Sequence, residues 1–282
     1  MKVFKRKNAV AKEIKALKAA NKTIGLVPTM GALHEGHLSL VENGLANNDV
    51  VFISIFVNPT QFNNKSDLTK YPRTLQKDID LLSDASNNIY VFAPSVEDVY
   101  DKNVNAIKFD FDGLENEMEG EFREGHFDGV GTIVKQLLEI VQPDNAYFGE
   151  KDFQQLQIIR KLVDKFHIPV NIVGCKIHRE PSGLAMSSRN MRLSPDHMLA
   201  APFIYKTLLS AKKKFGTKSA NKVTEWVKKQ FNGHKFLKLE YFKIADVKTL
   251  REVKRKSNKK KYRAFIAVYA DEVRLIDNIA LN

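Results

Sequence analysis

Two histidines lie in a short segment that joins an apolar stretch to an amphipathic one. The segment is residues 28–37, PTMGALHEGH, and it holds two glycines as well as His34 and His37. If helical geometry begins at His34, a spacing of three residues places both imidazoles on the same side of the helix. A helix N-terminus presents N–H groups and the positive end of the helix dipole, so the pair suits a phosphate whose charge grows during reaction. The simpler alternative is that both are surface or N-cap histidines.

A glycine, a lysine and an aspartate stand close together in residues 149–155. Gly149 follows a predicted strand, and Lys151 and Asp152 open a predicted helix. Lysine offers a compact positive charge to a phosphate, and aspartate offers a hard oxygen ligand to Mg²⁺. The segment therefore suits a nucleotide phosphate with its metal ion, although Lys151 and Asp152 could equally form an ion pair at the start of the helix.

Two serines and an arginine follow a glycine-containing turn in residues 180–190. Their hydroxyl and guanidinium groups can surround a polyphosphate and neutralise departing pyrophosphate. A Ser-Ser-Arg tripeptide is by itself an ordinary loop, so this interpretation depends on the other segments. Gln61 and Gln155 are uncharged amides that can donate and accept, as a hydroxylated organic acid requires, or they are ordinary surface amides.

These groups follow the strands of one predicted parallel sheet. Near-continuous apolar runs are typical of parallel strands that are covered on both faces, and strands that alternate with helices predict such a sheet. The loops after the strands then lie at one edge, outside the carboxyl ends, where ligands bind. The predicted strands are 23–28, 49–57, 89–92, 145–148 and 169–173, with a short edge strand at 107–111; the predicted helices are 8–20, 38–47, 69–84, 128–141 and 153–166, with an acidic loop at 115–123.

The pattern changes after residue 176. One or two helices over 195–231 precede runs that alternate between apolar and polar residues, which predicts a small, half-exposed antiparallel sheet. The predicted strands are 237–244, 262–269 and 273–276, with a Lys-rich hairpin loop at 254–261. The fold is therefore predicted as α/β: a Rossmann-like parallel-sheet domain over residues 1–176, followed by a smaller α+β domain with a short antiparallel sheet over residues 177–282.

Composition narrows the cellular setting. The chain has 282 residues, of which 43% are hydrophobic, so a sizeable core can form. Cys175 is the one cysteine, which excludes an intrachain disulfide. No signal peptide is evident, and no apolar run approaches the ~18 residues that a membrane helix needs. We therefore expect a cytoplasmic protein with no membrane partner.

The charge is unevenly distributed. The net charge is +12, but residues 206–263 hold 20 Lys and Arg against four acidic residues, so the remainder is weakly acidic. A groove for nucleic acid also needs aromatic stacking or an organised basic stripe, and neither is clear in this region. We expect a solvated basic surface that attracts polyphosphate, and no nucleic-acid partner. A nucleic-acid-binding protein stays as the alternative from a different functional class.

Six segments together resemble a known family. In chain order they are residues 28–37, 56–62 (FVNPTQF), 71–73 (YPR), 125–130 (GHFDGV), 147–155 and 183–190. They are similar to the motifs of pantothenate synthetases (pantoate–β-alanine ligases), members of the nucleotidylyltransferase superfamily with the His-x-Gly-His signature. The resemblance is dense over about residues 23–193, and the last third agrees mainly in length and strand pattern.

The resemblance implies an ATP-dependent ligase that condenses (R)-pantoate with β-alanine. Pantoate would attack the α-phosphate of ATP to give pantoyl adenylate and diphosphate, and β-alanine would then displace AMP to give pantothenate. ATP as co-substrate, Mg²⁺ and a homodimer are implied as well. The closest alternative is another nucleotidylyltransferase, which shares the histidine turn but does not need both Gln61 and Gln155.

The resemblance also implies roles for individual residues. His37, His34 and Lys151 would act at the phosphates; His37 is usually named the proton donor, but the nucleophile is already a carboxylate, so electrostatic stabilisation is better founded. The residues expected to bind pantoate are Gln61 and Gln155, with Gln61 also near β-alanine, and those expected to support the site are Arg123 and Asp78. The residues expected to contact ATP are Met30, Gly31, Ala32, Leu33, His34, Glu35, Gly36, His37, Gly149, Glu150, Lys151, Asp152, His178 (through its backbone), Met186, Ser187, Ser188 and Arg189. No metal ligand is assigned.

One position departs from the family pattern. Ser182, after Pro181, stands where the family usually has an acidic residue before the glycine of the Gly-Leu-Ala segment. A Pro-Ser-Gly turn is compatible with the same hairpin, so we expect altered mobility of this loop rather than lost activity.

Overall fold

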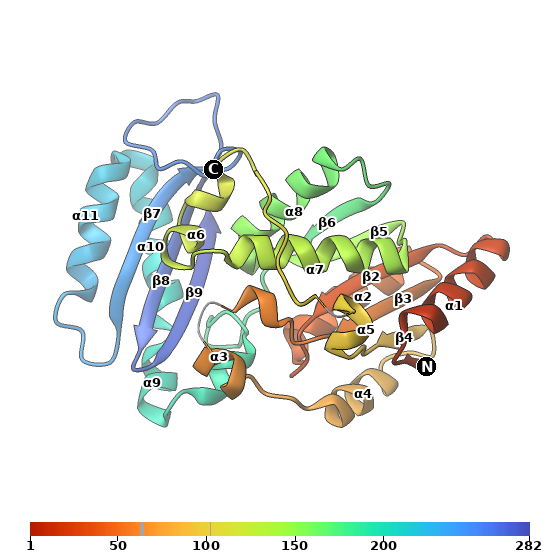
Figure 1. Ribbon diagram of the computed structural model, residues 1–282. Coiled ribbons are helices and arrows are strands. Elements are labelled where there is room, and N and C mark those ends of the chain that lie inside the picture. The colour runs from red at the N-terminus through yellow and green to blue at the C-terminus, as the bar shows by residue number, and fades with distance from the viewer. Residues whose placement is uncertain (63–64, 102) are drawn as a thin grey trace. The chain divides into compact units, whose positions relative to one another are not determined.

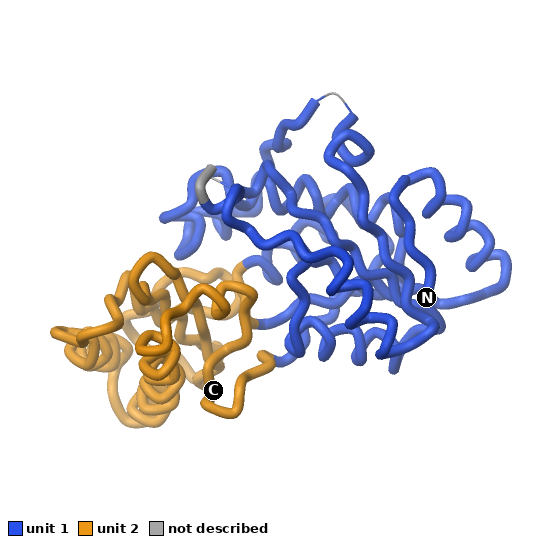
Figure 2. Tube along the Cα trace, turned by 90° about the horizontal axis from the view of Figure 1, so that it is seen from below, with its two compact units in different colours: residues 1–150, 155–176 blue, residues 151–154, 177–282 orange. Residues whose placement is uncertain are grey.

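The computed structural model describes residues 1–62, 65–101 and 103–282 (Figure 1). It divides into two compact units, which Figure 2 shows in different colours. The first unit holds residues 1–150 and 155–176, and the second holds residues 151–154 and 177–282. Four residues from the middle of the sequence therefore belong to the C-terminal unit, which no pattern in the sequence indicates.

Six parallel strands form the sheet of the first unit, in the order β1-β4-β3-β2-β5-β6. The strands are β1 (Lys2–Phe4), β2 (Ile24–Thr29), β3 (Val50–Ile55), β4 (Ile89–Phe92), β5 (Asn145–Gly149) and β6 (Asn171–Cys175). The central strands β2 and β3 are buried along nearly their whole length, as strands covered on both faces must be. This confirms the predicted Rossmann-like sheet, although the short edge strand β1 was not predicted.

Helices cover both faces of this sheet (Figure 1). The helices in this part of the chain are α1 (Lys7–Ala19), α2 (Glu35–Asn47), α3 (Lys65–Lys70), α4 (Leu75–Ser83), α5 (Val96–Tyr100), α6 (Glu119–Phe122), α7 (His126–Val141) and α8 (Phe153–Lys165). Leu40 and Val41 of α2 and Leu82 of α4 share a buried cluster with alternate residues of the strands, such as Val51 and Ile53. Helix α7 packs on β2 and on α1, and so covers the opposite face.

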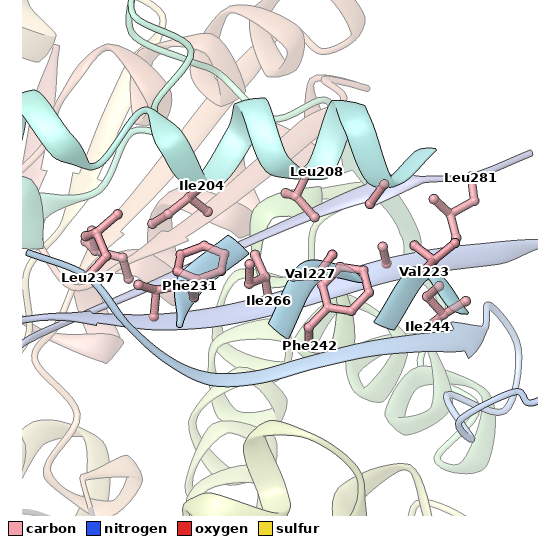
Figure 3. Packing of buried hydrophobic residues seen from close by; sticks show 14 of the residues in the cluster. Ile204, Leu208, Val223, Val227, Phe231, Leu237, Phe242, Ile244, Ile266 and Leu281 are labelled. Carbon is pink, nitrogen blue, oxygen red and sulfur yellow. The ribbon is translucent and has the colours of Figure 1, made fainter. Parts of the chain in front are cut away.

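The second unit is a three-stranded antiparallel sheet with helices on one face. Its elements are α9 (Pro195–Ala200), α10 (Phe203–Thr217), α11 (Ala220–Phe231), β7 (Lys238–Asp246), β8 (Tyr262–Ala270) and β9 (Val273–Ala280), and the strand order is β7-β8-β9. Figure 3 shows Ile204 and Leu208 of α10 and Val227 of α11 packed against Phe242 and Ile266 of the strands. This confirms the predicted α+β unit with its short antiparallel sheet.

Two predictions in the first unit are wrong. Residues 107–111 form no strand: the N–H of Ile107 donates to Thr132 Oγ1 at 2.8 Å and that of Phe109 donates to Asp128 Oδ1 at 3.0 Å. Side chains of α7 therefore bind the N–H groups that a strand would need. The helix predicted over 69–84 is two helices, because Pro72 disfavours helical geometry in the residue before it.

The acidic stretch 115–123 is also more ordered than a plain loop, since it contains a 3-10 turn, η2 (Leu114–Asn116), and α6. Within the part of the chain that the structure describes, no helix is both long enough and apolar enough to cross a membrane.

Candidate functional site

The histidine segment forms the turn between β2 and α2. Gly31 and Ala32 have φ of +81° and +50°, a left-handed conformation that a glycine adopts without strain. His34 is the N-cap of α2, and its Nδ1 accepts from the Gly36 N–H at 3.1 Å. The His34 N–H in turn donates to His37 Nδ1 at 3.3 Å, which completes a reciprocal capping box. The N-cap alternative is therefore correct as geometry.

The capping box determines which ring nitrogen of His34 and of His37 carries the hydrogen. Because each Nδ1 accepts a hydrogen bond, a neutral His34 or His37 carries its hydrogen on Nε2. The two ring centres are 4.1 Å apart, so the pair acts as one cluster of donors. Two Nε2–H donors at a helix N-terminus suit an anionic oxygen, so the structural and the chemical interpretations are compatible.

Asp78 of α4 supports the same turn. Its carboxylate accepts from the Ala32 N–H at 3.0 Å and from the Leu33 N–H at 2.8 Å, and it is only 3% exposed. A Cβ on Gly31 would lie 3.0 Å from Asp78 Oδ2, so the turn and the carboxylate are closely fitted. Asp78 therefore supports the turn by binding its backbone N–H groups.

Gln61 lies in η1 (Pro59–Gln61), the turn that follows β3. Its Oε1 accepts from Asn58 Nδ2 at 3.2 Å, and its Nε2 lies 2.8 Å from Met30 Sδ. Asn58 is 1% exposed, and its Oδ1 accepts from the Tyr100 hydroxyl at 2.5 Å. Burial raises the pKa of Tyr100, so the hydroxyl remains a donor across the physiological range. These contacts orient the amide of Gln61 and place it beside Met30.

Arg123 supports the same turn through a histidine. Its Nη1 lies 3.2 Å from His126 Nε2, and because arginine only donates, that ring nitrogen is the acceptor. His126 therefore carries its hydrogen on Nδ1 and donates it to the carbonyl oxygen of Gln61 at 2.9 Å. Gly129, one turn further along α7, permits this close approach, since a Cβ there would lie 2.2 Å from the carbonyl oxygen of Thr60.

Three loops of the first unit leave the sheet at one edge. Strand β2 lies between β3 and β5, and all three are parallel, so the histidine turn, η1 and Gly149–Glu150 start side by side. Gln155, in the first turn of α8, follows the third of these loops and is half-buried.

Burial, together with the nearby Glu150, raises the pKa of the Cys175 thiol at the end of β6, so that thiol stays protonated and unreactive.

In the second unit, Lys151 and Asp152 are neighbours in space as well as in sequence. Lys151 Nζ lies 3.8 Å from Asp152 Oδ2, a loose ion pair between side chains that are 20% and 48% exposed. The ion-pair alternative is therefore correct as geometry, and both side chains still reach solvent.

Residues 179–185 form a hairpin that leads into the Ser-Ser-Arg segment. Arg179 and Ala185 form a bridge, and Gly183 has a φ of +92° at the turn beside the exposed Ser182. The expected hairpin therefore forms with serine at that position. Met186 N–H donates to the carbonyl oxygen of His178 at 3.1 Å.

The Ser-Ser-Arg segment itself is braced from within the second unit. Ser187 caps η4 (Ser188–Arg192), its Oγ accepting from the Arg189 N–H at 3.3 Å. Asn190, 5% exposed, donates through Nδ2 to Glu180 Oε1 at 3.0 Å. The loop that bears the two serines and the arginine is thus held by buried polar contacts.

Residues 2–280 match the model of the family described as pantoate-beta-alanine ligase. The chain belongs to the pantoate–β-alanine ligase family. Curated relatives named pantothenate synthetase include one from Christiangramia forsetii, 58% identical over 282 residues and 100% of both chains, and one from Flavobacterium psychrophilum, 57% identical over 279 residues and 99% of both.

Solved ligases of this family share the whole fold. The pantothenate synthetase of Thermus thermophilus matches with a TM-score of 0.89 at 36% identity, over 100% of this chain and 99% of that one. The pantoate–β-alanine ligase of Francisella tularensis, complexed with β-γ ATP and β-alanine, matches with a TM-score of 0.80 at 37% identity, over 100% and 98%. The chain is an enzyme of the ligase class, and the family match decides against a different nucleotidylyltransferase.

The structure brings together only part of what the sequence suggests for this ligase. In the first unit the histidine turn, Asp78, Gln61 and Arg123 are joined by the contacts above, whereas Lys151 and residues 186–189 belong to the second unit. Sequence reasoning missed the supporting residues Asn58, Tyr100 and His126. Two of them lie within matched segments, FVNPTQF and GHFDGV, so a signal was available; for Tyr100 there was none.

Proposed function

We propose that this ligase condenses (R)-pantoate with β-alanine at the expense of ATP, giving pantothenate, AMP and diphosphate. One carboxylate oxygen of pantoate attacks the α-phosphorus of ATP, the bond to the β-phosphate breaks, and pantoyl adenylate and diphosphate form. The amine of β-alanine then attacks the acyl carbon, and AMP leaves. The relative from Francisella tularensis, complexed with β-γ ATP and β-alanine, supports both co-substrates.

The histidine turn is the observation that carries the proposal. Its two Nε2–H groups, the helix N-terminus and the left-handed backbone at Gly31 form a rigid set of donors. Such donors stabilise the charge that develops on phosphate oxygens when two anions combine. Neither histidine is needed as a base, because the attacking carboxylate is already deprotonated.

Other residues would bind the ends of the substrates. In the second unit, Lys151 and the Met186–Arg189 segment would contact phosphates, and the backbone of His178 would contact the adenine. In the first unit, Gln61 and Gln155 would bind the hydroxyl and carboxylate groups of pantoate, with Gln61 also near β-alanine. The contact of Asn58 with Gln61 Oε1 leaves Nε2 directed to the Met30 side, where it can donate.

Mg²⁺ would enter with ATP rather than occupy a cage of protein ligands. Among the described residues, no three His, Cys, Asp or Glu side chains are grouped so that they could hold a metal ion. Mg²⁺ is commonly held by phosphate oxygens, waters and one or two carboxylates, and Asp152, 48% exposed, is of the type that this requires.

Pyrophosphate–ATP exchange tests the two-step reaction. Exchange must require pantoate and must not require β-alanine, whereas formation of AMP and pantothenate must require both. Exchange without pantoate would refute pantoyl adenylate as the intermediate and would revive transfer to another acceptor.

His37→Ala tests the carrying observation. Turnover is expected to fall by about two or more orders of magnitude, the effect of losing one donor to a transition-state charge. His197→Ala is the matched control, because His197 likewise follows an N-cap, Ser194, by three residues and hydrogen-bonds to it at 2.7 Å. Equal turnover in the two variants would remove His37 from the chemistry.

Two further proposals rest on the family resemblance and charge pattern. The enzyme is proposed to be cytoplasmic and to be a homodimer; light scattering of the purified chain tests the homodimer. It is also proposed not to bind nucleic acid. Retention of an RNA or DNA fragment by the protein at moderate salt, with an affinity that falls steeply as salt rises, would contradict this proposal.

A further inference from the structure

Two adjacent residues near the end of β9 each contact a segment that bears proposed ATP ligands. Asp277 is 5% exposed and Asn278 is 2% exposed, and neighbouring residues of a strand point to opposite faces of the sheet. We propose that Asp277 and Asn278 are positioning residues that place Lys151 and the Ser187–Arg189 segment for phosphate binding. This inference rests on the proposed function, because it assumes that these two segments contact ATP.

Asn278 fixes the backbone at Lys151. Its Nδ2 donates to the Lys151 carbonyl oxygen at 2.9 Å, and its Oδ1 accepts from Arg263 Nη1. Arginine offers only donors and a carbonyl only accepts, so a single orientation of the Asn278 amide satisfies both partners. Arg263 therefore orients the amide, and the amide holds the main chain that carries the Lys151 ammonium group.

Asn278 shares its face of the sheet with Phe265 and Arg263 of β8. Phe265 is the cross-strand partner of Asn278, and Arg263 is the diagonal neighbour on that face. The Arg263 guanidinium lies over the Phe153 ring at 4.0 Å, and the Phe153 and Phe265 ring centres are 6.0 Å apart. Residues 151–153 are thus bound to β8 and β9 at both ends, which explains why they group with the second unit.

Asp277 acts on the hairpin at the other face. Its carboxylate accepts two bonds from Arg179, at 2.7 and 2.9 Å, in the parallel geometry that gives such pairs their directional precision. Arg179 also donates to the Gly183 carbonyl oxygen at 3.0 Å, and its guanidinium lies 3.6 Å from the Tyr205 ring centre. The hairpin 179–185 is therefore held in one register, and it leads directly into residues 186–189.

Stability alone does not account for these polar groups. The sheet already buries an extensive apolar core against α10 and α11, and a buried arginine or carboxylate is in general no more stabilising than apolar residues of the same size. What polar pairs add is direction, since hydrogen bonds fix angle as well as distance. One strand therefore sets the positions of two segments that are distant in sequence.

Asn278→Asp tests the part of the proposal that concerns Asn278 and Lys151, with almost no change in side-chain size. Aspartate keeps an acceptor for Arg263 but has no N–H for Lys151, so we expect pantoate-dependent pyrophosphate exchange to slow by roughly ten- to a hundredfold, the loss typical of a small misplacement. The KM for ATP should rise and that for pantoate should not. Asn282→Asp is the matched control, because Asn282 Nδ2 also donates to a lysine carbonyl, that of Lys260, at 2.9 Å, but in an exposed position.

A double-mutant cycle separates positioning from general destabilisation. If Asn278 acts through Lys151, then Asn278→Asp in a Lys151→Ala background should lower exchange less than about twofold further, since residues that act as a unit are not additive. Asn278→Ala provides the same comparison if the aspartate variant does not fold. Additive losses, or equal losses in exchange and in pantoate affinity, would overturn the inference while leaving the proposed function intact.

The part of the proposal that concerns Asp277 and the Ser187–Arg189 segment is tested in the same way, with Asp277→Asn combined with Arg189→Ala and the same criterion of non-additivity. ATP affinity by calorimetry without pantoate gives an independent readout. If the unmodified enzyme shows no pantoate-dependent exchange, the proposed function fails, but weaker ATP binding by Asn278→Asp than by Asn282→Asp would still support the inference, and equal binding would refute it.

Discussion

Asp78→Asn removes the carboxylate that holds the histidine turn. That carboxylate accepts the Ala32 and Leu33 N–H groups, one on each oxygen, in a position that is 3% exposed. An asparagine oxygen can accept only one of them, and its NH₂ group then faces the other N–H. A hydrogen bond to a charged group contributes about 1.5–3 kcal/mol, and a buried donor without a partner costs about 1–3 kcal/mol. We therefore expect the free energy of unfolding of the first unit to fall by about 2–4 kcal/mol.

Two measurements follow from this change. The thermal midpoint should fall by roughly 4–16 °C, at about 2–4 °C per kcal/mol for a domain of this size. The KM for ATP in pyrophosphate exchange should rise by about tenfold or more, because the turn proposed to contact the ATP phosphates loses its support and binds them less well.

Asp80→Asn is the matched control. Asp80 lies two residues further along α4 and is exposed, and its carboxylate accepts from the exposed Gln76 Nε2 at 2.8 Å. Its substitution should change stability by less than about 0.5 kcal/mol. If Asp78→Asn and Asp80→Asn have the same midpoint and the same KM for ATP, Asp78 does not support the turn and the argument is wrong.

Two other predictions concern packing and pH. Gly129→Ala would place a methyl group 2.2 Å from the Thr60 carbonyl oxygen, so it should destabilise the protein by about 1–3 kcal/mol and lower turnover. The control is Gly216→Ala, in open space on α10, which should leave stability unchanged or slightly raised. Equal urea midpoints for the two variants would refute this prediction. Burial alone would raise the pKa of Asp246, but N–H donors of the following turn and the Lys260 ammonium lower it overall, so its stabilisation is present above about pH 4 and is lost as pH falls through the depressed value. Asp246→Asn should accordingly be less stable than the unmodified protein at pH 7, by about 1 kcal/mol, with the difference shrinking as pH falls below about pH 4; a gap that does not shrink over that range would contradict it.

The sequence predicted the elements better than their boundaries. Apolar runs such as residues 49–57 identified the buried strands, because a strand covered on both faces has no polar side to display. The predicted edge strand at residues 107–111, where apolar and charged residues alternate, does not form, because its N–H groups bond to Thr132 and Asp128 of α7. Whether such a stretch becomes a strand depends on which partner reaches its backbone, and that partner lies some 20 residues away in the sequence.

The candidate site was likewise visible as residue types but not as contacts. The turn at residues 28–37 follows from local rules, since glycines, a helix start and two histidines three apart all act within ten residues. That the same histidines cap the helix through Nδ1, and so present Nε2, required the backbone coordinates.

The family, the two kinds of sheet and the chemistry-bearing segments could be predicted from the sequence, because they depend on local residue types and spacing. The distant residues that brace these segments could not: Asp78 lies 46 residues from Ala32, and Asn278 lies 127 residues from Lys151. Such pairs depend on sheet order and strand register, which assign neighbours regardless of distance along the chain. A hydrogen bond needs its partners within about 3 Å, and only the folded backbone supplies that precision.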